Sequence, residues 1–249
     1  MKIVVLIAGV HDPKWPIAPV GSEFPLPSAD HQIMSPFDEA ALEVALRIRD
    51  VNPDTLIHVY VAGGIAGGKI ARAVAAFNPA EISTMAFDSA WDQSAMADAL
   101  AELCTSAHIV LIGREFGDFD DGFVPSMLAA KMGFGFFGRA QMVDTIVNIS
   151  MVREVGSFEE RCTVSNPFVI SVTNDRRTRL RKPLMKNVML ARQTEIANIA
   201  ISPKISSRLR LVGATTGSAA RAPTTCTMIT GTHAQQAQAL ASLLGAPRV

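Results

Sequence analysis

The sequence predicts an α/β protein with a mainly parallel, doubly wound sheet and helices on both faces. Short runs rich in Val, Ile and Leu recur along the first half of the chain, and amphipathic helical patterns separate them. This alternation is typical of parallel strands that are buried on both sides. The chain has 249 residues, 49% of them hydrophobic and 18% charged, so it can bury a substantial core.

Composition also excludes some classes of function. Lys and Arg together number 23, as do Asp and Glu, and a neutral chain is atypical of general nucleic-acid or membrane-surface binding. The three cysteines have no metal-ligand spacing, which favours a reducing compartment. Residues 1–9 fit a buried first strand better than a signal peptide, and no apolar run approaches the roughly 20 residues of a membrane helix. We expect a soluble, cytoplasmic protein that binds no nucleic acid and does not insert into membranes.

The first element is a buried strand over residues 2–8. A Pro- and Ser-rich stretch, 11–34, follows as a long loop with room for a short ribbon, and a loop of this length in a compact domain is often functional. A helix then begins after Ser35, a good N-cap, with Pro36 at its first position. Its apolar stripe predicts a helix to about Arg49.

Strands and helices continue to alternate through the first half. We predict strands over 55–61, 82–87 and 107–112, and helices from 68 to about 77, over 92–104 and over 127–132. The glycine turn Ala62–Gly68 departs in register from G-x-G-x-x-G. It allows three interpretations: a tight turn with close packing, a nucleotide contact, or, least favoured, a dinucleotide site.

The pattern changes after about residue 138. Two extended runs, 143–152 and 160–164, flank the turn-forming Gly156-Ser157 and predict an antiparallel hairpin. A buried strand over 168–173 and a helix over 184–192 follow. Residues 193–231 show little periodicity, and Thr232 caps a last helix with Leu240, Leu243 and Leu244 on one face. The prediction is a nucleotide-binding-like domain over 1–192 and a C-terminal arm and helix over 193–249 that packs on a partner subunit.

The loop between the strand at 107–112 and the next helix is the favoured ligand site. It follows a buried strand and precedes a helix N-terminus, where unpaired N–H groups and the dipole suit a phosphate. Asp118, Asp120 and Asp121 suggest either a hydroxyl-binding acidic loop or, less favoured, a metal site. No hydrolytic triad is apparent, and we assign no catalytic residue. His11, at the end of the first strand, is the histidine best placed for a ligand.

The basic run between residues 176 and 186 has three interpretations. It could be a solvated face, a nucleic-acid surface, or a docking surface for an acidic partner or a phosphate-bearing cofactor. Nucleic acid is the least favoured, because no aromatic side chains accompany the run to stack on bases.

Six motifs together resemble the β subunit of electron transfer flavoproteins over nearly the whole chain. Ser35-Pro-Phe-Asp-Glu39 is similar to the family's N-P-F-[DC]-E at a helix start, and Gly113 to Asp121 is similar to its G-x-Q-[AS]-x-D-x-D loop. The other matches are the first strand before Asp12-Pro13, the Arg153-Glu154-Val-Gly156 hairpin, the strand 166–173, and Asn187-Val-Met-Leu-Ala-Arg192.

The resemblance implies an electron carrier and not an enzyme with its own acid–base chemistry. It implies a heterodimer with an α subunit, FAD shared with that subunit, and AMP or a second FAD as a further ligand of β. A flavin-dependent dehydrogenase would be the donor and a quinone-linked oxidoreductase the acceptor. By position, the cofactor-binding residues would be Leu6, Ser35, Pro36, Phe37, Asp38, Gly63, Arg114, Gly117, Asp118, Asp120, Asp121 and Val124. The partner-docking residues would be Arg181, Met185 and Lys186, and no metal is implied.

The sequence departs from the family pattern at the ligand loop. Glu115 replaces a Gln, and Phe123-Val124-Pro125 replaces Gln-Thr-Gly ahead of the helix. Pro125 lacks an N–H donor, so we expect weaker phosphate binding here. An adenine-nucleotide-binding module without electron transfer, and a nicotinamide-linked dehydrogenase, remain as alternatives.

Overall fold

The computed structural model describes residues 1–15, 31–63, 67–86, 92–118, 120–145, 148–164, 167–201 and 228–245. Tertiary contacts divide the chain into two units, 1–213 and 214–249, which are considered separately. No helix within these ranges is long and apolar enough to cross a membrane.

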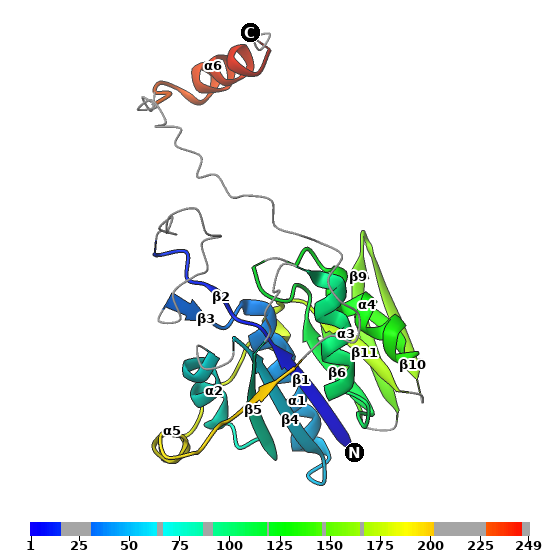
Figure 1. Ribbon diagram of the computed structural model, residues 1–249. Coiled ribbons are helices and arrows are strands. Elements are labelled where there is room, and N and C mark those ends of the chain that lie inside the picture. The colour runs from blue at the N-terminus through cyan, green and yellow to red at the C-terminus, as the bar shows by residue number, and fades with distance from the viewer. Residues whose placement is uncertain are drawn as a thin grey trace. The chain divides into compact units, whose positions relative to one another are not determined.

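The first unit is built on a seven-stranded sheet in the order β12-β5-β4-β1-β6-β11-β7 (Figure 1). Every neighbouring pair in it is parallel. This confirms the predicted α/β class. The strands are β1 (Lys2–Ile7), β4 (Leu56–Ala62), β5 (Glu81–Ala86), β6 (Ile109–Gly113), β7 (Gly135–Ala140), β11 (Phe168–Val172) and β12 (Ala197–Ala200).

Four helices cover the two faces of this sheet. Because side chains alternate along a strand, Ile3 and Val5 of β1 pack on one face and Val4 and Leu6 on the other. The first face carries α1 (Pro36–Val51) and α2 (Gly68–Ala75). The second carries α3 (Gln93–Leu103) and α4 (Phe123–Met132). The short α5 (Met185–Ala191) packs beside α2 through Ala191.

Two antiparallel elements accompany the sheet. The predicted hairpin is confirmed: β9 (Ile149–Val155) pairs with β10 (Phe158–Val164) across a two-residue turn, Gly156-Ser157, and Gly156 has φ +62°. β8 (Met142–Asp144) adds a third strand. The second element is a short ribbon of β2 (Val10–His11) and β3 (Gln32–Ile33), in which His11 lies opposite Gln32.

The structure differs from the sequence prediction at four places. The extended run predicted over 143–152 is not one strand, because it contains parts of both β8 and β9. Residues 197–200, expected to be irregular, form edge strand β12 on β5, because short edge strands carry little periodic signal. Strand β7 was not predicted, since its sequence GFFGRA is rich in glycine. Helix α4 begins at Phe123 and not near Met127, because Pro125 fits within a first helical turn.

The second unit contains the predicted C-terminal helix, α6 (His233–Gly245). Thr232 Oγ1 accepts a hydrogen bond from the N–H of Gln235 at 3.4 Å, as expected of a capping residue. None of its residues is buried, and Leu240, Leu243 and Leu244 are 52%, 68% and 80% exposed. An amphipathic helix with its apolar face uncovered is suited to packing on another chain, which remains a prediction.

Candidate functional site: the carboxyl edge of the sheet

The ligand site expected of this fold lies where the direction of the connections reverses. The chain leaves β1 toward β4 and β5 and reaches β6, on the other side of β1, only later. In open parallel sheets ligands bind beyond the carboxyl ends of the strands at such a switch point. The loops after β1, β4 and β6, together with the start of α1, form this edge, called here the carboxyl-edge site.

Asp38 joins the end of β1 to the start of α1. Its carboxylate accepts hydrogen bonds from the N–H groups of Ala8 at 3.3 Å, Gly9 at 3.1 Å and Ser35 at 3.0 Å. Ser35 Oγ accepts in return from the N–H of Asp38 at 3.0 Å, which completes a capping box. Complete burial raises the pKa of Asp38 above its ordinary value, and the donated N–H groups oppose that rise. Both polar side chains are therefore engaged within the protein.

Asp120 organises the loop between β6 and α4. Its Oδ2 accepts from the N–H of Phe116 at 2.8 Å. Its Oδ1 accepts from the N–H groups of Gly122 at 3.0 Å, Phe123 at 2.8 Å and Val124 at 3.1 Å. The carboxylate thus occupies the N-terminus of α4, where an external anion would otherwise bind.

The start of α4 consequently offers little to a phosphate. The N–H groups of Phe123 and Val124 are paired with Asp120, and Pro125, the third residue of the helix, has none. Val124 is also buried, with 1% of its surface exposed, so its side chain faces the core. This geometry agrees with the expectation of weak phosphate binding at this helix.

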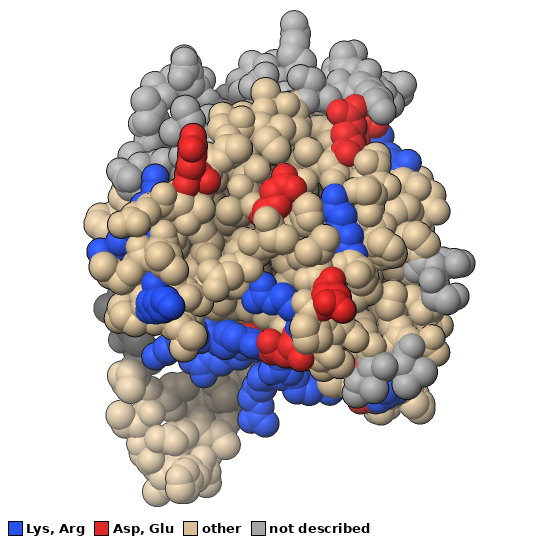
Figure 2. Space-filling view, turned by 90° about the horizontal axis from the view of Figure 1, so that it is seen from below, with Lys and Arg blue, Asp and Glu red and all other residues tan. Residues whose placement is uncertain are grey.

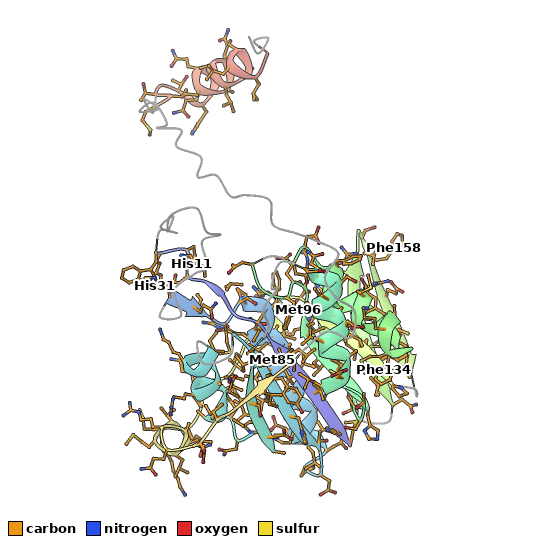
Figure 3. All side chains as sticks on the ribbon, viewed as in Figure 1. His11, His31, Met85, Met96, Phe134 and Phe158 are labelled. Atoms are coloured by element: carbon orange, nitrogen blue, oxygen red, sulfur yellow. The ribbon has the colours of Figure 1, made fainter. Side chains whose placement is uncertain are left out.

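The ribbon β2–β3 is tied to the same loop. The N–H of His11 donates to Asp118 Oδ2 at 2.9 Å. His11 Nε2 lies 2.7 Å from the carbonyl oxygen of Trp15, and since a carbonyl only accepts, Nε2 carries a proton. The indole of Trp15 stacks on His31 at 4.4 Å between ring centroids and an interplanar angle of 2°. Figure 3 shows His11 and His31 side by side at this end of the ribbon.

Two buried acceptors on the ribbon have no hydrogen-bond partner in the described structure. They are His11 Nδ1, which in the neutral ring bears a lone pair, and Gln32 Oε1. The two residues are cross-strand neighbours, so their side chains can act on one group. Buried polar atoms are usually paired, and two unpaired acceptors at a ligand edge suit a ligand that brings N–H or O–H donors.

The glycines at this edge allow close backbone approach. A Cβ on Gly67 would lie 2.4 Å from the carbonyl oxygen of Ala62, so this glycine is required for packing. Gly63 has φ +103° and lies beside Gln32 Oε1, and Gly117 has φ +80° and lies against Ala8. The tight-turn interpretation therefore holds for Gly67, and a nucleotide contact at Gly63 or Gly117 stays a prediction.

Phe37, in the first turn of α1, and Arg114, directly after β6, lie beside each other. The guanidinium carbon of Arg114 lies 5.8 Å from the centre of the Phe37 ring, and its Nε lies 3.4 Å from Glu115 Oε1. The remaining residues predicted to bind the cofactor differ in how far they are exposed. Leu6 is fully buried in the core under α3 and α4, whereas Pro36, Asp118 and Asp121 are exposed. Leu6 can contribute to binding only through its backbone.

Arg181 is held within the protein. Its Nη2 donates to Glu43 Oε1 at 2.9 Å, and its Nε donates to Glu43 Oε2 at 3.0 Å. Its backbone N–H donates to Glu43 Oε2 at 3.1 Å, and its Nη1 donates to Asp50 Oδ2 at 2.6 Å. Arg181 thus anchors the segment before α5 to α1. Within the same basic run, Arg177 pairs with Asp175 at 2.9 Å.

The surface at the amino ends of the strands is mixed in charge and not purely basic. Figure 2, seen from the end of the molecule that carries the amino ends of the strands, shows Lys and Arg side chains gathered with acidic side chains among them. The exposed positions of the segment from Leu184 to Leu190 are largely apolar: Leu184 is 71% exposed, Met185 75%, and Met189 and Leu190 53% each. Lys186 is also exposed.

The fold defines a class: a doubly wound α/β protein, in which the switch point of the sheet is the usual place for a ligand. The family comparison is more specific. A model of the electron transfer flavoprotein domain matches residues 27–204, well over half of the chain. The chain belongs to the electron transfer flavoprotein family, whose members are flavin-associated electron carriers. A comparison with curated proteins found no match.

Sequence reasoning missed Gln32, Trp15 and His31 as parts of this edge. All three lie at the ends of the segment 11–34, which was expected to be a functional loop with room for a ribbon. The only signal was the length of that loop. Nothing in the sequence indicated that His11 and Gln32 would be opposite each other.

Proposed function

We propose that this protein is the β-type subunit of a heterodimeric electron transfer flavoprotein and that it helps to hold FAD at its boundary with the α subunit. The observation that carries the proposal is a ligand edge with unpaired acceptors and the Phe37–Arg114 pair, in a chain of this family. When bound, the flavin would take electrons from a dehydrogenase and pass them on singly. The residues of this chain bind and orient it.

The groups at the carboxyl edge suit a flavin or nucleotide in distinct ways. Phe37 presents an aromatic ring and Arg114 a cation next to it, which together suit the flat edge of a conjugated ring. His11 Nδ1 and Gln32 Oε1 suit the N–H or O–H donors of a base or ribose. A phosphate at the start of α4 fits poorly, because Asp120 occupies that position. AMP or a second FAD bound by that helix is therefore not part of the proposal.

The exposed segment from Leu184 to Leu190 would dock the electron donor, a flavin-dependent dehydrogenase. It is apolar, and the Arg181–Glu43 pair fixes its start. Met185, which is exposed at the start of this segment, can fill a partner's pocket. Helix α6 would pack on the α subunit, and a quinone-linked oxidoreductase would accept the electrons.

Co-expression with the α subunit tests the proposal. A yellow complex in a 1:1 ratio, with a flavin absorbance spectrum and FAD released on denaturation, is the expected result. A colourless complex, or no complex, would contradict the proposal. Release of AMP or ADP without flavin would instead favour a nucleotide-binding module without electron transfer.

Phe37→Ala should weaken flavin retention in that complex about tenfold and change the flavin absorbance bands, because the ring facing the cofactor is removed. Flavin content after gel filtration and the visible spectrum are the measurements. Phe136→Ala, an exposed aromatic on β7 with 41% of its surface accessible, is the matched control and should leave both unchanged. Equal effects of the two substitutions would place the flavin away from Phe37.

Met185→Ala should lower the rate of electron transfer from the donor dehydrogenase about tenfold at subsaturating concentration, since one apolar anchor is lost. The flavin spectrum should not change, because Met185 lies outside the carboxyl-edge site. Leu56→Ala removes an apolar side chain with 53% exposure elsewhere on the surface and serves as the control. A rate unchanged by Met185→Ala would argue against docking at α5.

A further inference from the structure

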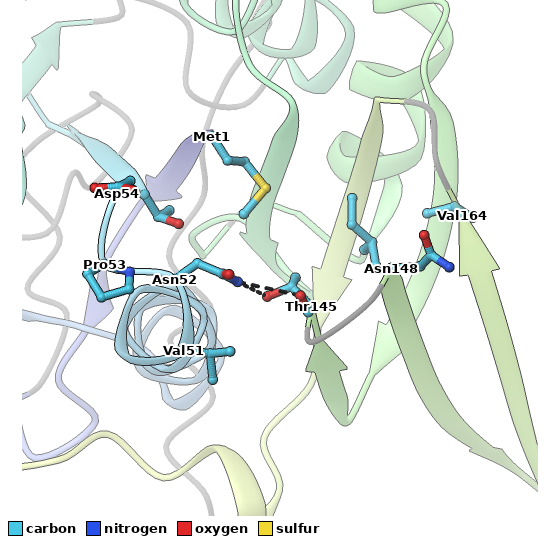
Figure 4. Close-up of a pocket in the computed structure, with 10 residues that line it drawn as sticks. Met1, Val51, Asn52, Pro53, Asp54, Thr145, Asn148 and Val164 are labelled. Atoms are coloured by element: carbon cyan, nitrogen blue, oxygen red, sulfur yellow. Dashed lines mark hydrogen bonds between the residues drawn. The ribbon is translucent and has the colours of Figure 1, made fainter.

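The hairpin of β9 and β10 runs along the first unit from the amino ends of the parallel strands toward their carboxyl ends. Its open end lies near the end of α1, where Figure 4 shows Asn148 and Val164 at the limits of the two strands. Asn52, the residue after α1, donates from Nδ2 to Thr145 Oγ1 at 2.9 Å, which ties the end of β8 to that helix. The hairpin therefore starts at the end of the sheet opposite the carboxyl-edge site.

The turn of the hairpin projects past the carboxyl ends of the strands. The N–H of Gln141, which follows β7, donates to the carbonyl of Val152 at 2.8 Å. Strand β9 continues over 153–155, so the turn lies roughly 10 Å beyond this bond. Figure 3 shows Phe158, directly after the turn, at the same end of the unit as His11. Residues 155–158, called here the hairpin tip, thus lie on the side of the unit where the flavin is proposed to bind.

The hairpin tip carries an exposed apolar pair. Val155 and Phe158 are opposite each other across the turn, and they are 42% and 77% exposed. Phe158 is more exposed than any other Phe or Trp in the part of the chain that the structure describes. Gly156-Ser157 makes the turn, and an aromatic that served only to hold the hairpin would lie against its cross-strand neighbour. Most of the Phe158 ring is instead open to a partner.

Arg153 fixes the hairpin tip to the sheet. Its Nη2 lies 2.7 Å from Oε2 of Glu160, its cross-strand neighbour. Its Nη1 donates to the carbonyl of Gly138 at 3.1 Å, and its guanidinium carbon lies 4.8 Å from the centre of the Phe137 ring. A side chain on a mount that is held before binding loses little conformational freedom when it binds. A rigid, exposed aromatic is the kind of residue that anchors protein interfaces.

Charge favours a protein partner over a membrane surface. Glu154 and Glu159 flank the apolar pair, and their side chains are 62% and 50% exposed. Their nearest cations, Arg177 and Arg161, lie 3.9 and 3.6 Å away, so both carboxylates are weakly paired. An anionic membrane would repel these groups. A protein pocket with an apolar centre and Lys or Arg at its rim complements the hairpin tip.

We propose that Phe158, with Val155 beside it, is an apolar anchor that enters such a pocket on the α subunit. The inference rests on the function proposed above, because an α subunit that shares the flavin covers the carboxyl edge, past which the hairpin tip projects. The hairpin tip shares no residue with the carboxyl-edge site. The anchor therefore strengthens the association of the subunits and does not itself hold the flavin.

The affinity of the α subunit for variants of the full-length chain, measured by titration calorimetry, tests the proposal. Phe158→Ala should raise the Kd at least about tenfold, because most of a buried apolar side chain is lost. Phe158→Leu should restore most of the affinity. Leu56→Ala, which shortens a 53% exposed side chain at the start of β4, is the control and should leave the Kd unchanged. All these side chains are exposed, so the thermal midpoint of each free variant should match the wild type.

Two further measurements separate the anchor from the flavin site. Amide hydrogen exchange at Gly156 and Ser157 should slow when the wild-type chain binds the α subunit. At concentrations well above its Kd, the Phe158→Ala complex should still be yellow and hold one FAD.

Three outcomes would overturn the proposal. Equal Kd values for Phe158→Ala and Leu56→Ala, or unchanged exchange at the turn, would remove the anchor and leave the proposed function intact. A wild-type chain that forms no complex with the α subunit would overturn both. Binding of the wild type, but not of Phe158→Ala, to phosphatidylcholine vesicles would show that the hairpin tip is a membrane anchor instead.

Discussion

Asp120→Ala is expected to lower the free energy of unfolding by about 3 kcal/mol. Loss of an N-cap carboxylate costs about 1 kcal/mol, and each buried N–H left unpaired adds about 1–3 kcal/mol, part of which water recovers. Four N–H groups lose their acceptor here, and those of Phe116 and Val124 are buried. Chemical denaturation followed by circular dichroism measures the change.

Asp121→Ala is the matched control, because the neighbouring carboxylate is exposed. It should change the free energy of unfolding by less than about 0.5 kcal/mol, as most exposed substitutions do. If the two variants lost stability equally, the loop would be held by its charge and not by the specific bonds of Asp120. A flavin contact made by Asp120 would instead appear as loss of cofactor without loss of stability.

Arg181→Ala should destabilise the protein by about 2–3 kcal/mol. The Glu43 side chain is only 3% exposed, and the substitution removes one of its two ion-pair partners. Arg47, at 2.9 Å, is the partner that remains. Breaking a buried pair costs about 3–5 kcal/mol, and the value is reduced here because the Arg181 side chain is 39% exposed. The segment that leads to α5 should also become sensitive to proteolysis. Arg179→Ala, an exposed arginine two residues away, should leave both properties unchanged.

The dependence on pH provides a further check of this pair. Burial alone would raise the pKa of Glu43, but the hydrogen bonds from Arg181 and Arg47 outweigh it and hold the pKa below its usual value of 4.5. A lowered folded-state pKa contributes stability that is complete above pH 4.5 and disappears as pH falls through the folded pKa. The difference in the free energy of unfolding between wild type and Arg181→Ala should therefore be constant near neutral pH and should shrink as the pH falls below 4.5. A difference that grew on acidification would contradict the assignment.

Much of the fold followed from local patterns. The Ser35-Pro36 helix start is confirmed with its capping box, as are the Gly156-Ser157 hairpin and the strand–helix alternation of the first half. These features were predictable because capping, turn conformation and side-chain periodicity involve residues that are neighbours in sequence. β7 and β12, the two edge strands of the sheet, were not predicted. An edge strand forms by pairing with the neighbouring strand, and its own sequence need not show a regular apolar pattern.

The candidate site was predictable only in outline. Its position after β6 and at the start of α1 follows from the order of elements, and the family follows from motifs along the chain. The role of each side chain in the site could not be predicted from the sequence. Three acidic residues in one loop look equivalent in sequence, yet Asp120 binds four backbone N–H groups, Asp118 binds the ribbon, and Asp121 is exposed.

The sequence by itself determined the class of fold and the family and predicted a ligand edge, because these depend on the order and periodicity of short segments. The tertiary structure decided which groups remain for a ligand. Arg181 reaches Glu43 across 138 positions, and His11 meets Gln32 only through the ribbon. Hydrogen-bond partners that are distant in sequence are selected by packing, and the groups left unpaired, such as Thr55 Oγ1, are known only once that selection has been made.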